Sequence, residues 1–314
     1  MTDRLIVAVS PHIHNKESVR KIMWLVSLSL MPAGVAGVII FGWSALWVII
    51  WSIISAIAAE GILQLLTKKK VSILDGSAVL TGLLLAYNLP PDVPFWLPIV
   101  GSFFAIAIGK QVFGGLGQNI FNPALVGRVF LMACWPRYMT TFVNPGYDAV
   151  TGATPLAFLR HAKTAPQFSY WDLFIGWHGG CIGEVCILAL LIGAAFLFIR
   201  KYIIWHIPVT YILTVGLLTF IFGPNGYFSG DWLFHILTGG LILGAFFMAT
   251  DYVTSPLTYK GQIIFGIGCG VITAVIRLWG GYPEGVSYAI LMMNAATPII
   301  DRFTKNRIYG TIRN

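Results

Sequence analysis

Asp148-Ala149-Val150-Thr151-Gly152-Ala153-Thr154-Pro155-Leu156 lies in a polar insert, residues 136–180, that separates two strongly apolar halves of the chain. The stretch offers two hydroxyls, one carboxylate and a glycine that permits a tight turn. Pro155 favours an extended backbone at Thr154, so the turn can present the Thr154 hydroxyl outward. The same composition also fits a threonine-capped turn that leads into a short helix over 156–161.

The composition on both sides of this insert is that of an integral membrane protein. Of the 314 residues, 57% are hydrophobic and only 10% are charged, with a mean hydropathy of +0.80. Soluble domains carry about 25% charged residues. Apolar runs near the length of a membrane span, about 20 residues, occur at 23–42, 44–66, 73–89, 94–112, 120–135, 181–199, 203–222, 232–250, 262–279 and 286–300. We predict a helix for each run, because a span in lipid must satisfy its own backbone hydrogen bonds.

The lysines and arginines indicate how these spans are oriented. With the N-terminus in the cytoplasm and ten spans, fifteen of the 20 basic residues fall inside, three fall outside, and Arg128 and Arg277 fall within spans. The inside residues are Arg4, Lys16, Arg20, Lys21, Lys68, Lys69, Lys70, Lys110, Arg200, Lys201, Lys260, Arg302, Lys305, Arg307 and Arg313, and the outside residues are Arg137, Arg160 and Lys163. This asymmetry obeys the positive-inside rule and predicts that both termini are cytoplasmic and that the insert is external. It also explains the net charge of +8 better than nucleic-acid binding does.

The spacing Asp-x-x-Thr-Gly-Ala-Thr at 148–154 resembles the motif read by flavin transferases of the ApbE type, which esterify the phosphate of FMN to the last threonine. Other motifs that accompany it are Ser10-Pro11-His12-Ile13, Leu74-Asp75-Gly76, Phe113-Gly114-Gly115, Asn122-Pro123-Ala124-Leu125 and Met248-Ala249-Thr250-Asp251. Together they resemble the NqrB/RnfD family of membrane subunits over nearly the whole chain, with RnfD the nearer member and NqrB the more distant one.

The resemblance implies an all-α integral membrane fold, similar to urea transporters, with ten helices in two inverted five-helix repeats. The parts would be a cytoplasmic tail at 1–22, one repeat at 23–135, the external flavin-bearing loop at 136–180, the second repeat at 181–303 and a cytoplasmic tail at 304–314. Two short matches suggest the repeat independently: Leu80-Thr81-Gly82 with Leu237-Thr238-Gly239, and Phe113-Gly114-Gly115 with Trp279-Gly280-Gly281. In the charge-derived topology, the members of each pair lie at opposite ends of their spans, as inverted copies should.

The function implied by the resemblance is that of a subunit of a redox-driven ion pump, the Rnf ferredoxin:NAD+ oxidoreductase of a prokaryotic cell membrane. FMN would be bound to Thr154 through a phosphoester, with Asp148, Thr151, Gly152 and Ala153 as the surrounding recognition motif. A second, noncovalent flavin such as riboflavin is left open. The implied partners are other Rnf subunits, including an external flavin subunit and an iron–sulfur or NADH-side subunit, a flavin transferase, and Na+ or H+.

Acidic residues in or beside the spans are candidates for an ion pathway, because a carboxylate at mid-membrane costs about 2.5–3.5 kcal/mol. Asp75, Asp251 and Asp301 fall where the family carries acids linked to cation passage, and we rank them above Glu60 and Glu184 for that reason. An interfacial or capping role is the alternative for all five. Lys110 and Arg128 could pair with such acids or with a flavin phosphate.

Nothing else in the sequence indicates chemistry by the chain alone. It contains no nucleophile–base pair, no nucleotide-binding glycine fingerprint and no cysteine spacing typical of a metal or iron–sulfur site. His12-x-His14 is an isolated pair in a polar tail. We therefore predict no catalytic residue and no metal. Two alternatives remain: an NqrB-like subunit of a Na+-translocating NADH:quinone oxidoreductase, and a redox-silent channel with a urea-transporter-like fold.

Overall fold

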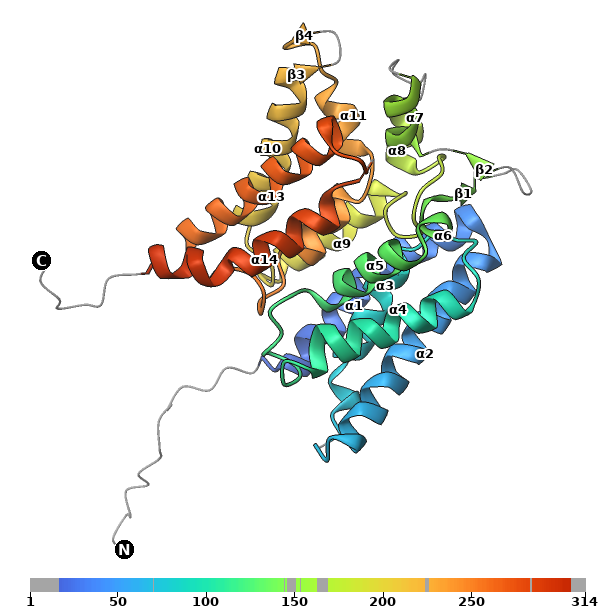
Figure 1. Ribbon diagram of the computed structural model, residues 1–314, viewed down its shortest axis with the longest axis vertical. Coiled ribbons are helices and arrows are strands. Elements are labelled where there is room, and N and C mark those ends of the chain that lie inside the picture. The colour runs from blue at the N-terminus through green and yellow to red at the C-terminus, as the bar shows by residue number, and fades with distance from the viewer. Residues whose placement is uncertain are drawn as a thin grey trace, which may run out of the picture.

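The computed structural model describes residues 17–69, 71–143, 145, 151–152, 154–162, 169–223, 226–282 and 284–305. Over these residues the chain is mostly helical (Figure 1). The predictions for His12-x-His14 and for most of the two terminal tails lie outside the described residues.

The first half contains α1 (Val19–Phe41), α2 (Trp43–Leu66), a 3₁₀ turn η1 (Ile73–Asp75), α3 (Ser77–Tyr87), α4 (Trp96–Ile106), a π-helical turn η2 (Ala107–Gln111) and α5 (Pro123–Cys134). Local sequence explains where several of them begin. The Ser18 side chain accepts from the Lys21 N–H at the start of α1, and Asn122 caps α5 directly before Pro123. Gly42, with φ 76°, separates α1 from α2 in a conformation that favours glycine.

The polar insert holds three short helices and one pair of short strands. These are α6 (Pro136–Thr140), β1 (Phe142–Val143), β2 (Thr151–Gly152), α7 (Pro155–Ala162) and α8 (Tyr170–Ile175). β1 pairs antiparallel with β2, so that Phe142 lies opposite Gly152.

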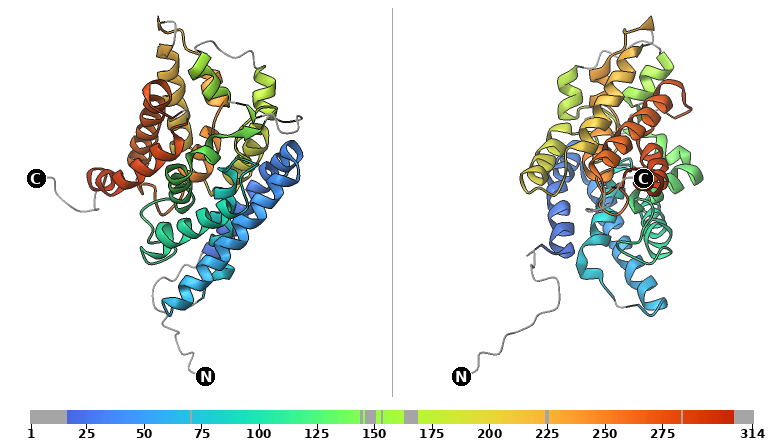
Figure 2. Two further views of the ribbon diagram at one scale, coloured as in Figure 1. Left: turned by 45° about the vertical axis from the view of Figure 1, so that its right-hand side comes forward. Right: turned by 90° about the vertical axis from the view of Figure 1, so that its left-hand side faces the viewer.

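The second half contains α9 (Ile187–Ile199), α10 (His206–Ile221), the strand pair β3 (Phe222–Gly223) and β4 (Gly226–Tyr227), α11 (Trp232–Leu237), α12 (Leu241–Leu243), a π-helical turn η3 (Gly244–Met248), α13 (Tyr259–Trp279) and α14 (Val286–Phe303). Figure 2 shows the two halves side by side in two further orientations.

Each of the ten predicted apolar runs contains helix. Three helices, α1, α2 and α13, are long and apolar enough to cross a membrane, and five shorter apolar helices accompany them. The protein is mostly helical, and its described residues also include two pairs of two-residue strands.

Two predicted runs differ from single helices. Residues 181–186 are not helical, because Ile182 and Gly183 donate their N–H groups to the carbonyls of Leu89 and Tyr87 in the turn after α3. The run 232–250 is broken between α11 and α12, where Gly239 has φ 68°.

Helix contacts are arranged alike in the two halves. In the first half α2 packs on α3 and α4, and α4 packs on α5; in the second half α10 packs on α11 and α13, and α13 packs on α14. The halves meet through α1 against α9 and through α5 against α14. The first of these crossings is close enough to require glycine, because a Cβ on Gly193 would lie 2.0 Å from the Ser29 carbonyl oxygen.

The two tripeptide matches have different outcomes. Phe113-Gly114-Gly115 and Trp279-Gly280-Gly281 both lie at the end of the fourth helix of their half, after η2 and at the end of α13. In the other match, Gly82 is inside α3 but Gly239 is left-handed at the break after α11. The match between Leu80-Thr81-Gly82 and Leu237-Thr238-Gly239 therefore does not mark equivalent local structure.

Candidate functional site

Thr154 begins α7 as a helix cap. Its Oγ1 accepts a hydrogen bond from the Ala157 N–H at 3.2 Å, and its carbonyl accepts from the Phe158 N–H at 2.8 Å. The prediction of a threonine-capped turn leading into a short helix is confirmed, with α7 spanning Pro155–Ala162. Thr154 is only 4% exposed. The expectation that the turn presents this hydroxyl outward is therefore wrong, because the hydroxyl is used to cap the helix.

Burial of Thr154 accompanies the docking of α7 onto the rest of the insert and the second half. Leu156 forms a small apolar cluster with Leu173 of α8 and Phe234 of α11. Of the other motif residues, Thr151 and Gly152 form β2, while Asp148 and Ala153 lie outside the described residues. The structure thus brings the start of α7 against α8 and α11.

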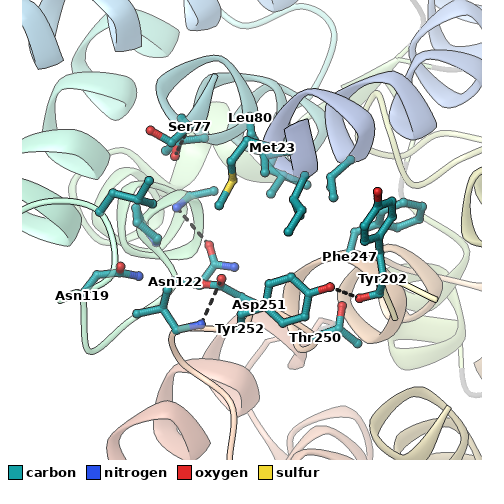
Figure 3. Close-up of a pocket in the computed structure, with 18 of the residues that line it drawn as sticks. Met23, Ser77, Leu80, Asn119, Asn122, Tyr202, Phe247, Thr250, Asp251 and Tyr252 are labelled. Carbon is teal, nitrogen blue, oxygen red and sulfur yellow. Dashed lines mark hydrogen bonds between the residues drawn. The ribbon is translucent and has the colours of Figure 1, made fainter. Parts of the chain in front are cut away.

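A pocket of about 90 Å³ lies where the two halves meet (Figure 3). Its lining comes from α1, α3 and the segment before α5 in the first half, and from the end of α9, η3 and residues 250–253 in the second half. Most of this lining is apolar. The polar groups gathered in it are Ser77, Thr81, Lys110, Asn119, Asn122, Tyr202, Thr250, Asp251 and Tyr252.

The two asparagines in this pocket are held by backbone contacts. Asn122 accepts from the Ala124 N–H through Oδ1 and donates from Nδ2 to the Met248 carbonyl at 3.2 Å, so it joins the first half to η3. Asn119 donates from Nδ2 to the Phe121 carbonyl at 3.1 Å. Its amide oxygen remains available to a donor on a ligand.

Lys110 ends in a buried polar network beside this pocket. Its ammonium donates to both carboxylate oxygens of Glu60, at 2.7 and 2.8 Å, and to the Ser77 hydroxyl at 2.6 Å. Ser77 donates in turn to Oδ1 of Asp75 at 2.6 Å. Lys110 is 2% exposed and Glu60 is 1% exposed, so Lys110 does not belong with the exposed cytoplasmic charges among which its sequence position placed it.

The three acids ranked highest from sequence all accept hydrogen bonds typical of turns. Asp75 accepts from the Ser77 N–H, Asp251 accepts from Val253 and Thr254, and Asp301 accepts from the Leu257 N–H. They are only partly buried. Asp251 lines the pocket, and Asp75 reaches its edge through Ser77.

Glu60 and Glu184, which we ranked lower, are the deeply buried acids. Glu284 was not a candidate at all, and it pairs with Arg128 at 2.5 Å. An acid in an apolar run was the available signal for Glu60. The sequence held no comparable signal for Glu284, which precedes α14 in a glycine- and proline-containing loop.

Comparison with known proteins gives matches over nearly the full chain. A model of the NQR2, RnfD, RnfE family matches residues 6–310. The chain is similar to the D subunit of the Na(+)-translocating ferredoxin:NAD(+) oxidoreductase complex of Acetobacterium woodii, with 52% identity over 312 residues, 98% of this chain and 96% of the relative.

Two further relatives extend this similarity. The D subunit of the proton-translocating ferredoxin:NAD(+) oxidoreductase complex of Clostridium ljungdahlii is 52% identical over 319 residues, with the same coverage. The D subunit of the ion-translocating oxidoreductase complex of Stutzerimonas stutzeri is 41% identical over 329 residues, 94% of this chain and 93% of the relative.

Proposed function

This chain belongs to the NQR2, RnfD, RnfE family, and we propose that it is the D subunit of an ion-translocating ferredoxin:NAD+ oxidoreductase of the Rnf type in a prokaryotic cell membrane. The observation that carries the proposal is the similarity to D subunits over 98% of the chain. It favours this function over an NqrB-like subunit or a redox-silent channel. The chain acts with its partner subunits and is not catalytic alone.

Its cofactor is FMN, joined by a phosphoester to Oγ1 of Thr154. The motif Asp148-x-x-Thr151-Gly152-Ala153-Thr154 supports this assignment. A cofactor is needed because the polar side chains of the described sites carry protons and charges but no electron carrier, so the protein supplies position and electrostatics. Asp148 and Gly152 act in recognition by a flavin transferase, the first through its charge and the second by permitting a tight turn.

The test is the flavin content of two matched variants. Thr154→Ala should abolish the ultraviolet-excited flavin band on a denaturing gel, because it removes the ester oxygen. Thr151→Ala, three residues earlier in the same motif, should weaken the band at most. A Thr154→Ala protein that kept its covalent fluorescence would place the flavin elsewhere and refute the assignment.

The pocket between the halves is where a second, noncovalent flavin would bind. Its volume of about 90 Å³ is smaller than that of typical small-molecule sites, about 300–1,000 Å³, so the two halves would have to move apart to admit a flavin ring. An apolar lining suits a planar ring, and the carboxamides of Asn119 and Asn122 suit the carbonyl and imide edge of an isoalloxazine. The same Thr154→Ala protein checks this site, because it should still release flavin when it is denatured in acid.

The fold that we propose is ten membrane helices in two inverted repeats with an external insert. The similar packing order of the two halves supports it. So do the contacts between first helices, α1 and α9, and between last helices, α5 and α14, because elements that correspond under a two-fold axis meet one another near that axis. In this arrangement α11, α12 and η3 together form the third helix of the second half.

The ion is Na+ or H+. The relatives at 52% identity include one named for each ion, so similarity does not choose between them. Asp75, Asp251 and Asp301 form the proposed pathway on the cytoplasmic side.

A further inference from the structure

Three groups that bind protons or cations meet at the junction of the two halves, outside the sites described above. The Sγ of Cys181 and carboxylate oxygens of Glu184 and Glu284 all lie within 4.8 Å of one another. Cys181 and Glu184 belong to the segment before α9, and Glu284 directly precedes α14. Glu184 is 5% exposed and the Glu284 side chain is 10% exposed, so both carboxyl groups are largely removed from water.

The two carboxyl groups have unequal partners. Glu284 accepts from the Arg128 guanidinium, whose other hydrogen bonds go to Asn88, Ser287 and the Cys181 sulfur. Glu184 accepts from the N–H of Cys181 through Oε1 at 3.1 Å, and its carboxyl group also meets the Cys181 thiol and the Glu284 carboxylate. Its Oε2 is buried and has no hydrogen-bond partner among the described residues. That oxygen lies 3.0 Å from where a Cβ on Gly240 would be, so Gly240 packs closely against it.

Other charged groups near the pair are directed elsewhere. Arg277 of α13 donates to the carbonyls of His235 and Thr238. These hydrogen bonds direct its Nη1 and Nη2 atoms to backbone carbonyls rather than to Glu184. His178 is buried beside the segment, with Nδ1 at 3.1 Å from the Gly179 carbonyl and Nε2 without a partner among the described residues. Burial lowers the pKa of His178, so the ring is neutral and offers Nε2 as an acceptor rather than a charge.

An ionised Glu184 would therefore place a buried carboxylate oxygen next to a second carboxylate, with the Cys181 thiol, a weak donor, as the side-chain donor beside both. Such an arrangement costs several kcal/mol in a water-poor interior. A metal ion would relieve it poorly. Na+ and other hard cations prefer about six oxygen ligands, whereas this group supplies two carboxylates and a thiol. The Arg128 Nη2 is also 3.9 Å from Sγ of Cys181 and repels a second cation there.

We propose that Glu184 and Glu284 form a proton-binding pair in which Glu184 is the protonated member and Glu284 the ionised member. The proton on Glu184 supplies the donor that Oε2 otherwise lacks, and Glu284 balances the charge of Arg128. Binding forms one O–H bond on Glu184 and changes no oxidation state. The proposed proton site requires no flavin, so its test is independent of the test for the covalent cofactor.

Infrared spectroscopy of the purified intact complex tests the site. At neutral pH the wild type should show the carbonyl stretch of a protonated carboxyl group, which shifts in heavy water. Glu184→Gln should remove that band, because the amide keeps the shape of the protonated acid and carries no carboxyl group. Asp92→Asn, which changes an exposed acid, should leave the band in place. A wild type without the band, or a band that survives in Glu184→Gln, would overturn the proposal.

The stability of two variants gives a second, independent measurement. Glu184→Gln should leave the melting temperature of the complex nearly unchanged, because residue 184 is already neutral. Glu284→Gln should lower it clearly, because it leaves Arg128 without its counter-charge. Equal losses in the two variants, including a failure of Glu184→Gln to assemble, would show that Glu184 is ionised and overturn the proposal. So would loss of the wild-type band on adding NaCl at constant pH, which would identify Na+ as the occupant.

Discussion

At the scale of single residues, the buried charged side chains were the hardest feature to predict from the sequence. Hydropathy marks an acid within an apolar run but does not show whether that acid has a partner. The partner of Glu60 is Lys110, 50 residues away on η2, and the partner of Arg128 is Glu284, 156 residues away. These pairs exist only once the helices pack, which is why an interfacial role looked adequate for Glu60.

Breaking the Glu60–Lys110 pair should lower the free energy of unfolding, by an amount that depends on which charge is left unpaired. Lys110→Met leaves Glu60 buried without its cation, and we expect a loss of about 3–5 kcal/mol in the free energy of unfolding. The double variant Lys110→Met/Glu60→Gln should recover most of that loss, because no unpaired charge is left. Denaturant or thermal unfolding of the detergent-solubilised protein measures both.

The exposed pair Lys21–Glu17, joined at 2.7 Å, is the matched control. Lys21→Met should leave the free energy of unfolding nearly unchanged, because water screens both charges. If Lys110→Met is as stable as Lys21→Met, the buried network is not the structural pair described here.

At the scale of elements, α7 limits access to the Thr154 hydroxyl that we propose as the attachment point of FMN. The hydroxyl is 4% exposed and caps the helix, and Leu156 anchors the helix on Leu173 and Phe234. A transferase needs that oxygen as a nucleophile, so it must act on a state in which the start of α7 is undocked. Undocking exposes only a small apolar cluster, so such local opening costs much less than global unfolding.

Loosening the anchor should therefore speed modification. Phe234→Ala removes an apolar contact of Leu156 without changing the motif itself, and we expect faster FMN attachment to unmodified protein incubated with a flavin transferase. The rate of appearance of covalent flavin fluorescence measures this. Trp171→Ala on α8, a residue that is 69% exposed, is the control and should leave the rate unchanged. Equal rates in wild type and Phe234→Ala would show that docking of α7 does not limit access.

Helices with long, uniformly apolar sequences were the easiest to predict. α1, α2 and α13 follow directly from long apolar runs. The start of α5 follows from Asn122-Pro123, which supplies a cap and then a residue suited to the first helical turn. The break between α11 and α12 and the turn at 181–186 were not predictable. Both depend on packing between distant segments, such as Ile182 donating to the Leu89 carbonyl.

At the scale of the whole molecule, the structure removes one residue from the set of exposed cytoplasmic charges, and the predicted orientation in the membrane stays the same. Lys110 is buried against Glu60 and no longer counts among the cytoplasmic charges. Fourteen basic residues then remain inside against three outside, which still favours an external insert. The topology could be predicted from this charge asymmetry and from the family resemblance. The contacts between the two halves could not be predicted from the sequence, because they depend on how the helices pack.

Cysteine labelling tests this orientation. In a chain whose four cysteines are replaced, Thr164→Cys, which lies outside the described residues, should react with an impermeant maleimide in intact cells. Lys68→Cys, in the turn after α2, should react only after lysis. Labelling of both positions in the opposite order would reverse the topology and place the FMN motif in the cytoplasm.

The polar groups of the molecule gather where the halves meet, and this placement distinguishes the three candidate acids. Asp251 lines the pocket and Asp75 adjoins it through Ser77 and the Lys110 network, whereas Asp301 accepts from the Leu257 N–H beyond the pocket lining. A carboxylate beside such a pocket can bind a hard cation or carry a proton. We therefore expect Asp251→Asn and Asp75→Asn to reduce ion transport by inverted vesicles several-fold, and Asp301→Asn to reduce it less.

Asparagine suits this comparison because it removes the charge and keeps one acceptor oxygen, which suffices for the printed bonds of Asp75 and Asp301, whereas Asp251 accepts through both oxygens. All three variants should retain covalent FMN, which separates a transport defect from a folding defect, and Asp92→Asn, a change at an exposed acid, should transport at the parental rate. Parental transport by all three variants would assign the acids to their turns alone. A loss at Asp301 as large as that at Asp251 would show that the ion path extends beyond the pocket, because Asp301 is not among the lining residues.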